Sequence, residues 1–281
     1  MTTVLIPTDF STNAMHAISY ALDLYKCEQT IFYFIHAYAD EVYGTLKNNT
    51  DLSISEYRTS IEKQAKKQLS NLITDKQEKN HNPKHEYKGL AIFESLVDAV
   101  NDTVNEINID VIIMGTKGQT ADKKITFGSQ TVQVFKYVKC PVLAIPETYS
   151  YQQPKNILFP TDYNLPYKRR ELKLLNALAH EFKSTVYCLH ISDFETLSLR
   201  QLDNKQFLEE SLPNTFLSFE QTPVKNRLNA IMISIEEKDI DLLVMVNSRH
   251  SFLEDMLFRS TVDKIGLKIH VPFLVLQNLS R

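Results

Sequence analysis

The sequence predicts an α/β protein made of two tandem Rossmann-like domains, each a five-stranded parallel sheet with helices on both faces. Three observations support this fold class. The second half repeats motifs of the first half in the same order, short apolar runs alternate with segments of helical periodicity, and a glycine-rich stretch follows the fourth apolar run. Such alternation is typical of parallel strands joined by crossover helices. A chain of 281 residues has room for two domains of about 140 residues each.

The internal repeat defines the domains. The motif VLIPTDF at residues 4–10 returns as ILFPTDY at residues 157–163. A short polar stretch that ends in a proline separates the two copies and suits a linker. We therefore predict one domain over residues 1–147 and a second over residues 154–281.

The strands of the first half are expected where short apolar runs occur. They are Val4–Pro7, Ile31–His36, His85–Ile92, Val111–Met114 and Val142–Ile145. With right-handed crossovers, the strand order reverses between the first and fourth strands, so the carboxyl ends of these two should face a ligand crevice.

Helices are expected between these strands, because apolar residues recur there at three- and four-residue spacing. The first begins at Ser11 or Thr12, and the last covers about residues 129–138. A lysine-rich helix follows Ser53, which forms a capping-box pattern with Glu56. The apolar residues expected to face the sheet are Met15, Ile18, Leu22 and Tyr25, then Ile61, Ala65, Leu69 and Leu72, and finally Val97, Val100, Val104 and Ile107.

Three of the six glycines lie in one stretch, GTKGQTADKKITFGS, directly after the fourth strand. At Gly115 and Gly118, backbone amides without Cβ crowding can wrap an anion. Gly128 precedes the helix that begins at Ser129, where unpaired N–H groups and the helix dipole favour phosphate. Asp9, at the end of the first strand, can accept hydrogen bonds from ribose hydroxyls. A turn inherited from the fold, without a ligand, is the alternative interpretation.

With its PTDFS opening and its Gly-x2-Gly-x9-Gly-Ser motif, the chain resembles a tandem, UspA-like universal stress protein of the ATP-binding type. The resemblance implies an adenine nucleotide alpha hydrolase-like fold in both halves and ATP or a related adenine nucleotide as the ligand. Mg²⁺ would arrive with the phosphates, because it keeps waters and needs few protein ligands. The nucleotide-binding residues that the resemblance implies are Pro7 and Asp9 at the nucleoside, Ala37 at the adenine, and Gly115, Lys117, Gly118, Gly128, Ser129 and Gln130 around the phosphates. Met114 is expected in the same site.

The second half departs from this motif. Asn247, His250 and Arg259 stand where the first half has its three glycines, whereas Asp162 and Ser260 persist. Side chains at these positions occupy space that the phosphates need. We therefore predict that the second domain does not bind ATP in the same manner, although His250 and Arg259 could hold a different small anion.

Several function classes receive no support from the sequence. The formal net charge is -3 and the basic residues are scattered, which argues against a nucleic-acid partner. No apolar run is long enough to span a bilayer and no signal sequence is evident, so we expect a cytoplasmic location without membrane contact. Phosphate-loop, dinucleotide and hydrolase motifs are absent, as are catalytic pairs and metal clusters. Cys27, Cys140 and Cys188 are expected to be buried or partly buried thiols, and His36 and His190 structural histidines.

The combined expectation is a stress protein in which ATP bound to the first domain changes the conformation of residues 119–127 and a surface that unidentified protein partners contact. Two alternatives stay open: a scaffold that acts without nucleotide, and a slow ATPase. The last strands, residues 142–145 and 273–276, are expected to pair into an internal pseudo-dimer. Homodimerisation of the whole chain is a further alternative, since exposed strand edges need to be covered.

Overall fold

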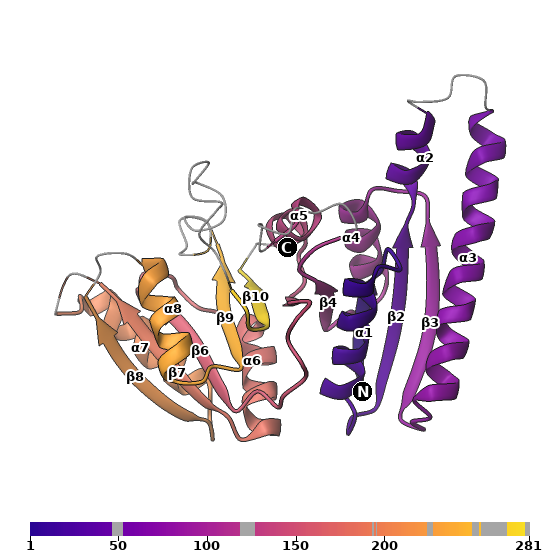
Figure 1. Cartoon of the computed structure of the whole chain (residues 1–281). Coiled ribbons are helices and arrows are strands. Elements are labelled where there is room, and N and C mark those ends of the chain that lie inside the picture. Colours follow the sequence, from indigo (N-terminus) through magenta and orange to yellow (C-terminus); the bar gives the residue numbers. More distant parts are fainter. Residues whose placement is uncertain are drawn as a thin grey trace. The chain divides into compact units, whose positions relative to one another are not determined.

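The computed structural model of the chain describes residues 1–46, 53–118, 127–192, 194, 196–223, 227–248, 253 and 269–278 (Figure 1). These residues divide into two compact units, one ending at Cys140 and the other beginning at Pro141. The predicted fold class is confirmed, because each unit combines a mostly parallel sheet with helices. The units divide before the strand Val142–Ile145, whereas the predicted domains divide after it.

The first unit contains four parallel strands: β1 (Thr2–Pro7), β2 (Thr30–Ala37), β3 (His85–Ile92) and β4 (Val111–Gly115). Their spatial order is β3-β2-β1-β4. The central strand β1 is the most deeply enclosed, and Val4, Leu5 and Ile6 are fully buried. Strands buried on both faces show continuous apolar runs, which is why the sequence predicted these strands closely.

Five helices are described in the first unit: α1 (Thr12–Leu24), α2 (Ala39–Leu46), α3 (Ile54–Lys79), α4 (Leu96–Glu106) and α5 (Ser129–Tyr137). The predicted buried face of α3 is confirmed. The predicted capping box is wrong, because Ser53 makes no side-chain cap and its hydroxyl contacts that of Ser55. The predicted face of α4 is only partly correct. Its buried residues are Ala99, Val100 and Thr103. Thr103 can be buried because its hydroxyl donates a hydrogen bond to the carbonyl oxygen of Ala99.

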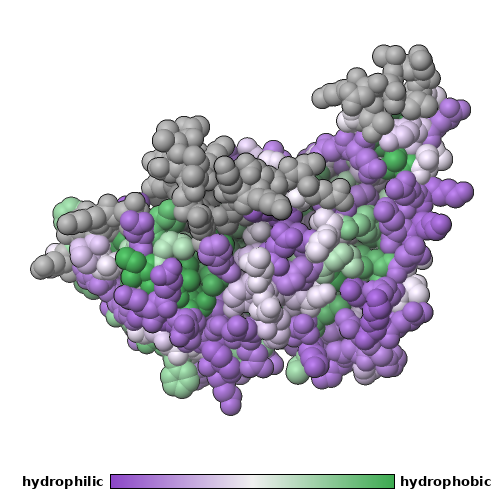
Figure 2. Space-filling model, in the orientation of Figure 1, coloured by the Kyte–Doolittle hydropathy of each residue, from purple (hydrophilic) through white to green (hydrophobic). Residues whose placement is uncertain are grey.

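Helices α2 and α3 extend past the carboxyl ends of β2 and β3 (Figure 1). A small buried cluster joins the two helices and consists of Tyr38, Val42, Ile61 and Ala65. The outer surface along α3 is hydrophilic (Figure 2), with charged side chains such as the ion-paired Lys66 and Glu62. Helix α3 therefore packs against the cluster through its apolar face and leaves its charged face exposed, as expected of an amphipathic helix.

The second unit repeats the pattern with β6 (Asn156–Thr161), α6 (Arg169–Phe182), β7 (Thr185–Ile191), α7 (Leu199–Ser211), β8 (Phe216–Thr222), α8 (Arg227–Glu237), β9 (Leu242–Asn247) and β10 (Phe273–Gln277). These five strands are parallel in the order β8-β7-β6-β9-β10. Strand β5 (Val142–Ile145) joins them by pairing antiparallel with β10, with Leu143 opposite Leu274. This pairing of the last strands of the two repeats is the one that the sequence led us to expect.

Two further expectations concern membrane segments and cysteines. Among the described helices, none combines the length and the apolar character needed to cross a membrane. Cys140 and Cys188 are buried as expected, but the expectation for Cys27 is wrong. Cys27 is exposed because it lies in the turn after α1, outside the face that packs on the sheet.

The pairing of β5 with β10 buries Phe273 completely. Phe273→Ala should lower the free energy of unfolding by about 3–5 kcal/mol, because it removes a large apolar side chain and leaves a cavity. Urea unfolding followed by circular dichroism would measure this change. Phe216→Ala is the matched control, since Phe216 is 69% exposed, and an equal loss in both variants would contradict a core role for Phe273.

Glu171 lies in the first turn of α6. Its Oε1 atom accepts a hydrogen bond from the backbone N–H of Lys168 at 2.8 Å, while its buried Oε2 atom has no partner among the described residues. Burial raises the pKa of Glu171 from 4.5 to about 7, against the opposing effects of the Lys168 hydrogen bond and charge. The unfolded chain therefore ionises at a lower pH than the folded chain, and the carboxyl group costs stability as the pH rises from 4.5 to about 7.

Glu171→Gln should remove this pH dependence and keep an acceptor for the Lys168 N–H. A pKa difference of this size corresponds to about 3 kcal/mol, so the variant should gain up to roughly that much relative to the natural chain between pH 4 and pH 8. Urea unfolding at several pH values would test it. Glu181→Gln, at an exposed position of the same helix, should follow the natural chain. An E171Q curve parallel to that of the natural chain would rule out ionisation of Glu171 as the cause.

Candidate functional site

The carboxyl ends of β1 and β4 lie side by side in the first unit. The two strands are parallel neighbours, with Val4 opposite Val111 and Leu5 opposite Ile112. Strand β2 lies on the other side of β1, so the chain turns in opposite directions from these two strand ends. In open α/β sheets such a switch point leaves a crevice in which ligands bind. The predicted site residues at the ends of these strands, Pro7 and Gly115, therefore flank this place.

The glycine stretch brings Gly118 close to Gly128 and to Asp9. A Cβ atom at Gly118 would lie 3.2 Å from Oδ2 of Asp9. A Cβ atom at Gly128 would lie 3.5 Å from Cα of Lys117 and 3.7 Å from the backbone nitrogen of Gly118. The N–H of Gly128 also donates to the carbonyl oxygen of Thr116 at 2.8 Å. The loop after β4 and the start of α5 thus lie at van der Waals distance from each other.

Asn13 of α1 holds this loop in place and was not predicted from the sequence. Its Nδ2 atom donates to the carbonyl oxygen of Lys117 at 2.6 Å. A Cβ atom at Gly115 would lie 2.8 Å from the side chain of Asn13, so only glycine fits there. From the other side, the Thr131 hydroxyl lies 3.0 Å from the carbonyl oxygen of Thr116 and 3.2 Å from that of Gly115. Two neighbouring helices therefore position the backbone of the loop.

The direction of the loop carbonyls sets the direction of its amides. A trans peptide holds its C=O and the following N–H on opposite sides, and the described residues contain no cis peptide. Because the Lys117 carbonyl faces Asn13, the N–H of Gly118 points away from α1. This N–H has no hydrogen-bond acceptor among the described residues. An anion next to Gly118 would provide one.

The turn after β1 orients Asp9. Phe10 has a left-handed backbone, with φ at 60°, and its N–H donates to the Thr8 hydroxyl. The N–H of Ser11 donates to Oδ1 of Asp9 at 3.0 Å, and the Ser11 hydroxyl in turn caps α1 by accepting from the N–H of Ala14. One carboxylate oxygen of Asp9 is therefore held by the turn, while the other faces Gly118.

At the end of β2, His36 connects the strands beside the predicted nucleoside position. Its Nδ1 atom lies 2.7 Å from the carbonyl oxygen of Thr8, and since a carbonyl can only accept, Nδ1 carries the proton. The imidazole ring also packs on Phe10, with centroids 4.9 Å apart, and Nε2 lies 3.8 Å from a carboxylate oxygen of Glu41. This is the structural role expected for His36. Ala37, the next residue, ends β2 and is half-buried.

The remaining predicted residues lie near the start of α5 and the end of β4. Ser129 is the first residue of α5 and is exposed, and the preceding N-cap residue has no side chain. The Nε2 atom of Gln130 donates a hydrogen bond to the carboxylate of Asp40 in α2 at 3.3 Å. Met114 is buried in β4, and Lys117 is half-buried. Among the described residues, no group of three or more acidic, histidine or cysteine side chains is placed to hold a metal.

The second unit builds the same turn after its first strand. Tyr163 has φ at 56° and its N–H donates to the Thr161 hydroxyl, while the N–H of Asn164 donates to Oδ1 of Asp162 at 2.9 Å. His190 packs on Tyr163 with ring centroids 5.1 Å apart, as His36 packs on Phe10 in the first unit. The strand-end geometry is therefore common to both repeats.

The two repeats differ at the position of the first glycine. Asn247, which replaces Gly115, is buried at the end of β9, and its Nδ2 atom donates to Oε1 of Gln277 in β10 at 2.9 Å. The other two replacements, His250 and Arg259, lie outside the described residues, as does Ser260. A buried side chain thus stands where the first unit has a glycine packed against Asn13.

Comparison with solved structures supports the fold over the whole chain. A universal stress protein from Archaeoglobus fulgidus DSM 4304 matches with a TM-score of 0.67 and 17% identity, covering 98% of this chain and 96% of that chain. A functionally unknown protein from Pseudomonas aeruginosa PAO1 matches with a TM-score of 0.56 and 12% identity, covering 98% and 92%. The cytoplasmic domain of a prokaryotic cation chloride cotransporter matches with a TM-score of 0.50 and 13% identity, covering 98% and 95%. At these identities the likeness concerns the fold alone.

Sequence comparison adds the family. The comparison with curated protein sequences gives no match. The profile of the universal stress protein family matches residues 1–146, which include both ends of the glycine stretch and the turn after β1. Because this match spans more than half of the 281 residues, the chain belongs to the universal stress protein family.

Proposed function

We propose that the first domain binds ATP or a related adenine nucleotide where β1 and β4 end, and that the chain acts in the cytoplasm as a nucleotide-responsive stress protein. The observation that carries this proposal is the approach of Gly118 and Gly128 to each other beside Oδ2 of Asp9. Glycines at such a place leave room for a ligand that must come close to the backbone.

Each part of the nucleotide has a partner of suitable chemistry in this proposal. The phosphates lie against the Gly118 N–H and the start of α5, where the positive end of the helix dipole favours anions. The ribose hydroxyls donate to Oδ2 of Asp9, and the adenine lies near the backbone of Ala37. Mg²⁺ would accompany the phosphates and keep most of its waters. Hydrolysis of the nucleotide is not part of the proposal.

The second domain is not assigned a nucleotide. Asn247 occupies the position of the first glycine and is already hydrogen-bonded to Gln277. Moving the Asn247 side chain would break this buried hydrogen bond and leave polar atoms unpaired, at a cost of about 1–3 kcal/mol. This cost favours a single nucleotide site per chain, located in the first domain.

Replacing Gly118 by a large residue should abolish ATP binding. In Gly118→Arg, the Cβ atom alone lies 3.2 Å from Oδ2 of Asp9, and the rest of the side chain fills the space proposed for the phosphates. Equilibrium dialysis with labelled ATP at millimolar concentration should then detect no bound nucleotide. Gly44→Arg in α2 is the matched control, since a Cβ atom at Gly44 would meet nothing within 4 Å. Unchanged ATP binding in G118R would overturn the proposed site.

The proposed ribose contact predicts a specific loss in Asp9→Asn. Asparagine can still accept from the N–H of Ser11 but loses the charge, and a hydrogen bond to a charged group contributes about 1.5–3 kcal/mol. The affinity for ATP should fall at least about tenfold. The affinity for 2′,3′-dideoxy-ATP, which lacks both ribose hydroxyls, should hardly change. Isothermal titration calorimetry would compare the two ligands.

The repeat supplies the control for this measurement. Asp162→Asn changes the equivalent carboxylate of the second unit, which is held by the same kind of turn. This variant should bind ATP as the natural chain does. An equal loss of affinity for ATP and for the dideoxy analogue in D9N would place Asp9 away from the ribose.

A further inference from the structure

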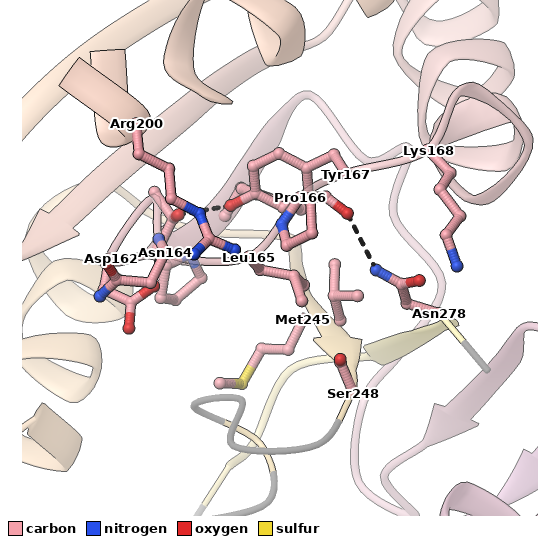
Figure 3. Close-up of a pocket in the computed structure, with 14 residues that line it drawn as sticks. Asp162, Asn164, Leu165, Pro166, Tyr167, Lys168, Arg200, Met245, Ser248 and Asn278 are labelled. Atoms are coloured by element: carbon pink, nitrogen blue, oxygen red, sulfur yellow. Dashed lines mark hydrogen bonds between the residues drawn. The ribbon is translucent and has the colours of Figure 1, made fainter. Parts of the chain in front are cut away.

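The second unit contains a cavity of about 320 Å³ (Figure 3). This cavity is not part of the nucleotide site proposed for the first domain. It lies where β6 and β9 end, and its lining includes Asp162 after β6 and Met245 and Val246 in β9. Ligand pockets usually measure about 300–1,000 Å³, so this one has room for a small organic molecule. Its position at the switch point of the sheet is a usual place for a ligand.

One wall of the cavity exists only in the second unit. In the first unit α1 begins at Thr12, three residues after Asp9 (12 − 9), whereas α6 begins at Arg169, seven residues after Asp162 (169 − 162). The four additional residues belong to the segment 164–168, and every residue of this segment lines the cavity.

This wall is fixed at both sides. The Tyr167 hydroxyl is buried and hydrogen-bonds to the Thr161 hydroxyl at the end of β6, at 2.5 Å. Next to it, the carbonyl oxygen of Pro166 accepts from Nδ2 of Asn278, which follows β10, at 3.2 Å. Both hydrogen bonds are drawn in Figure 3. The cavity is therefore bounded by a segment that is attached to two strand ends.

The base of the cavity is apolar and its rim is charged. Phe159, Met245 and Val246 are buried residues of the sheet that line the base. At the rim, Lys168 and Arg200 contribute two positive charges and Asp162 one negative charge. The negative charge is partly satisfied, because Oδ1 of Asp162 accepts from the backbone N–H of Asn164.

Arg200 is the group best suited to receive a ligand. It lies in the first turn of α7, is exposed, and forms no ion pair with any carboxylate among the described residues. Figure 3 shows its guanidinium group reaching over Leu165, with Lys168 on the other side of the labelled residues. A guanidinium group pairs with a carboxylate through two parallel hydrogen bonds.

We infer that the second unit binds a small organic anion, with an apolar body on the base of the cavity and a carboxylate head at Arg200. Lys168, on the opposite side of the cavity, adds positive charge to the rim and so a weaker, longer-range attraction for an anion. The size of the cavity and the buried Asn247 make this ligand different from the nucleotide proposed for the first unit. The two repeats thus use equivalent strand ends for two different classes of ligand.

The two methionines at these places allow each site to be observed separately. Met245 lines the cavity, and Met114 lies at the end of β4 in the first unit. In the full chain labelled with ¹³C at the methionine methyl groups, benzoate should shift the Met245 resonance and leave the Met114 resonance in place. Benzyl alcohol, which has the same ring without the charge, should bind about tenfold more weakly. ATP should shift Met114 and leave Met245 in place.

Variants separate a charge contact from simple entry into an apolar cavity. Arg200→Gln should weaken benzoate binding about tenfold and make it similar to that of benzyl alcohol. Lys168→Gln should cause a smaller loss in the same direction. Lys173→Gln, at an exposed position of α6 outside the lining, should bind as the natural chain does. An unchanged methyl spectrum in the absence of ligand would confirm that each variant is folded.

The inference is overturned if benzoate and benzyl alcohol bind equally well, if R200Q leaves the benzoate affinity unchanged, or if benzoate shifts Met114 as much as Met245. Failure of ATP to shift Met114 would count against the proposed function of the first domain alone. The two proposals therefore fail independently.

Discussion

The hydrogen bond from Asn13 to the carbonyl oxygen of Lys117 is the constraint on which the candidate site depends. It requires the loop after β4 to pass so close to α1 that a Cβ atom at Gly115 would collide with the Asn13 side chain. It also orients the Lys117–Gly118 peptide so that the Gly118 N–H faces away from α1, because a trans peptide places its C=O and its N–H on opposite sides. The Asn13 side chain thereby explains both why residue 115 is a glycine and which way the Gly118 N–H points.

The two repeats share the turn after their first strand and differ in the residues around that turn. In each, a left-handed residue after the first strand places a carboxylate whose Oδ1 atom accepts from the N–H two residues later. Around this common turn, the first unit uses glycines to bring a loop close, whereas the second inserts a wall held by Tyr167 and fills the position of Gly115 with Asn247. The unit that lacks the glycine motif therefore contains a cavity wall that the other unit does not have.

The sequence alone predicted the strands and the glycine loop well, for a physical reason. Buried parallel strands need continuous apolar runs, and glycines are costly unless a close approach requires them. The short helix α2 was missed because its eight residues are fewer than the roughly 11 residues over which helical periodicity is normally judged. The role of Asn13 could not be predicted, since it depends on contact with a loop about one hundred residues away. The cavity was missed for the same reason, because the residues before α6 read as an ordinary loop until Tyr167 and Asn278 are seen to fix them.

The contact between Gln130 and Asp40 limits how a nucleotide could act on the rest of the first unit. It is an exposed hydrogen bond of 3.3 Å between α5 and α2, and α2 packs with α3. A phosphate that engaged the Gln130 amide would release Asp40, but such a bond contributes only about 0.5–1.5 kcal/mol. A free energy of about 1 kcal/mol changes an equilibrium about fivefold, far less than a switch from one state to the other requires. The Gln130–Asp40 contact by itself would therefore be too weak to switch α2 and α3 between two states.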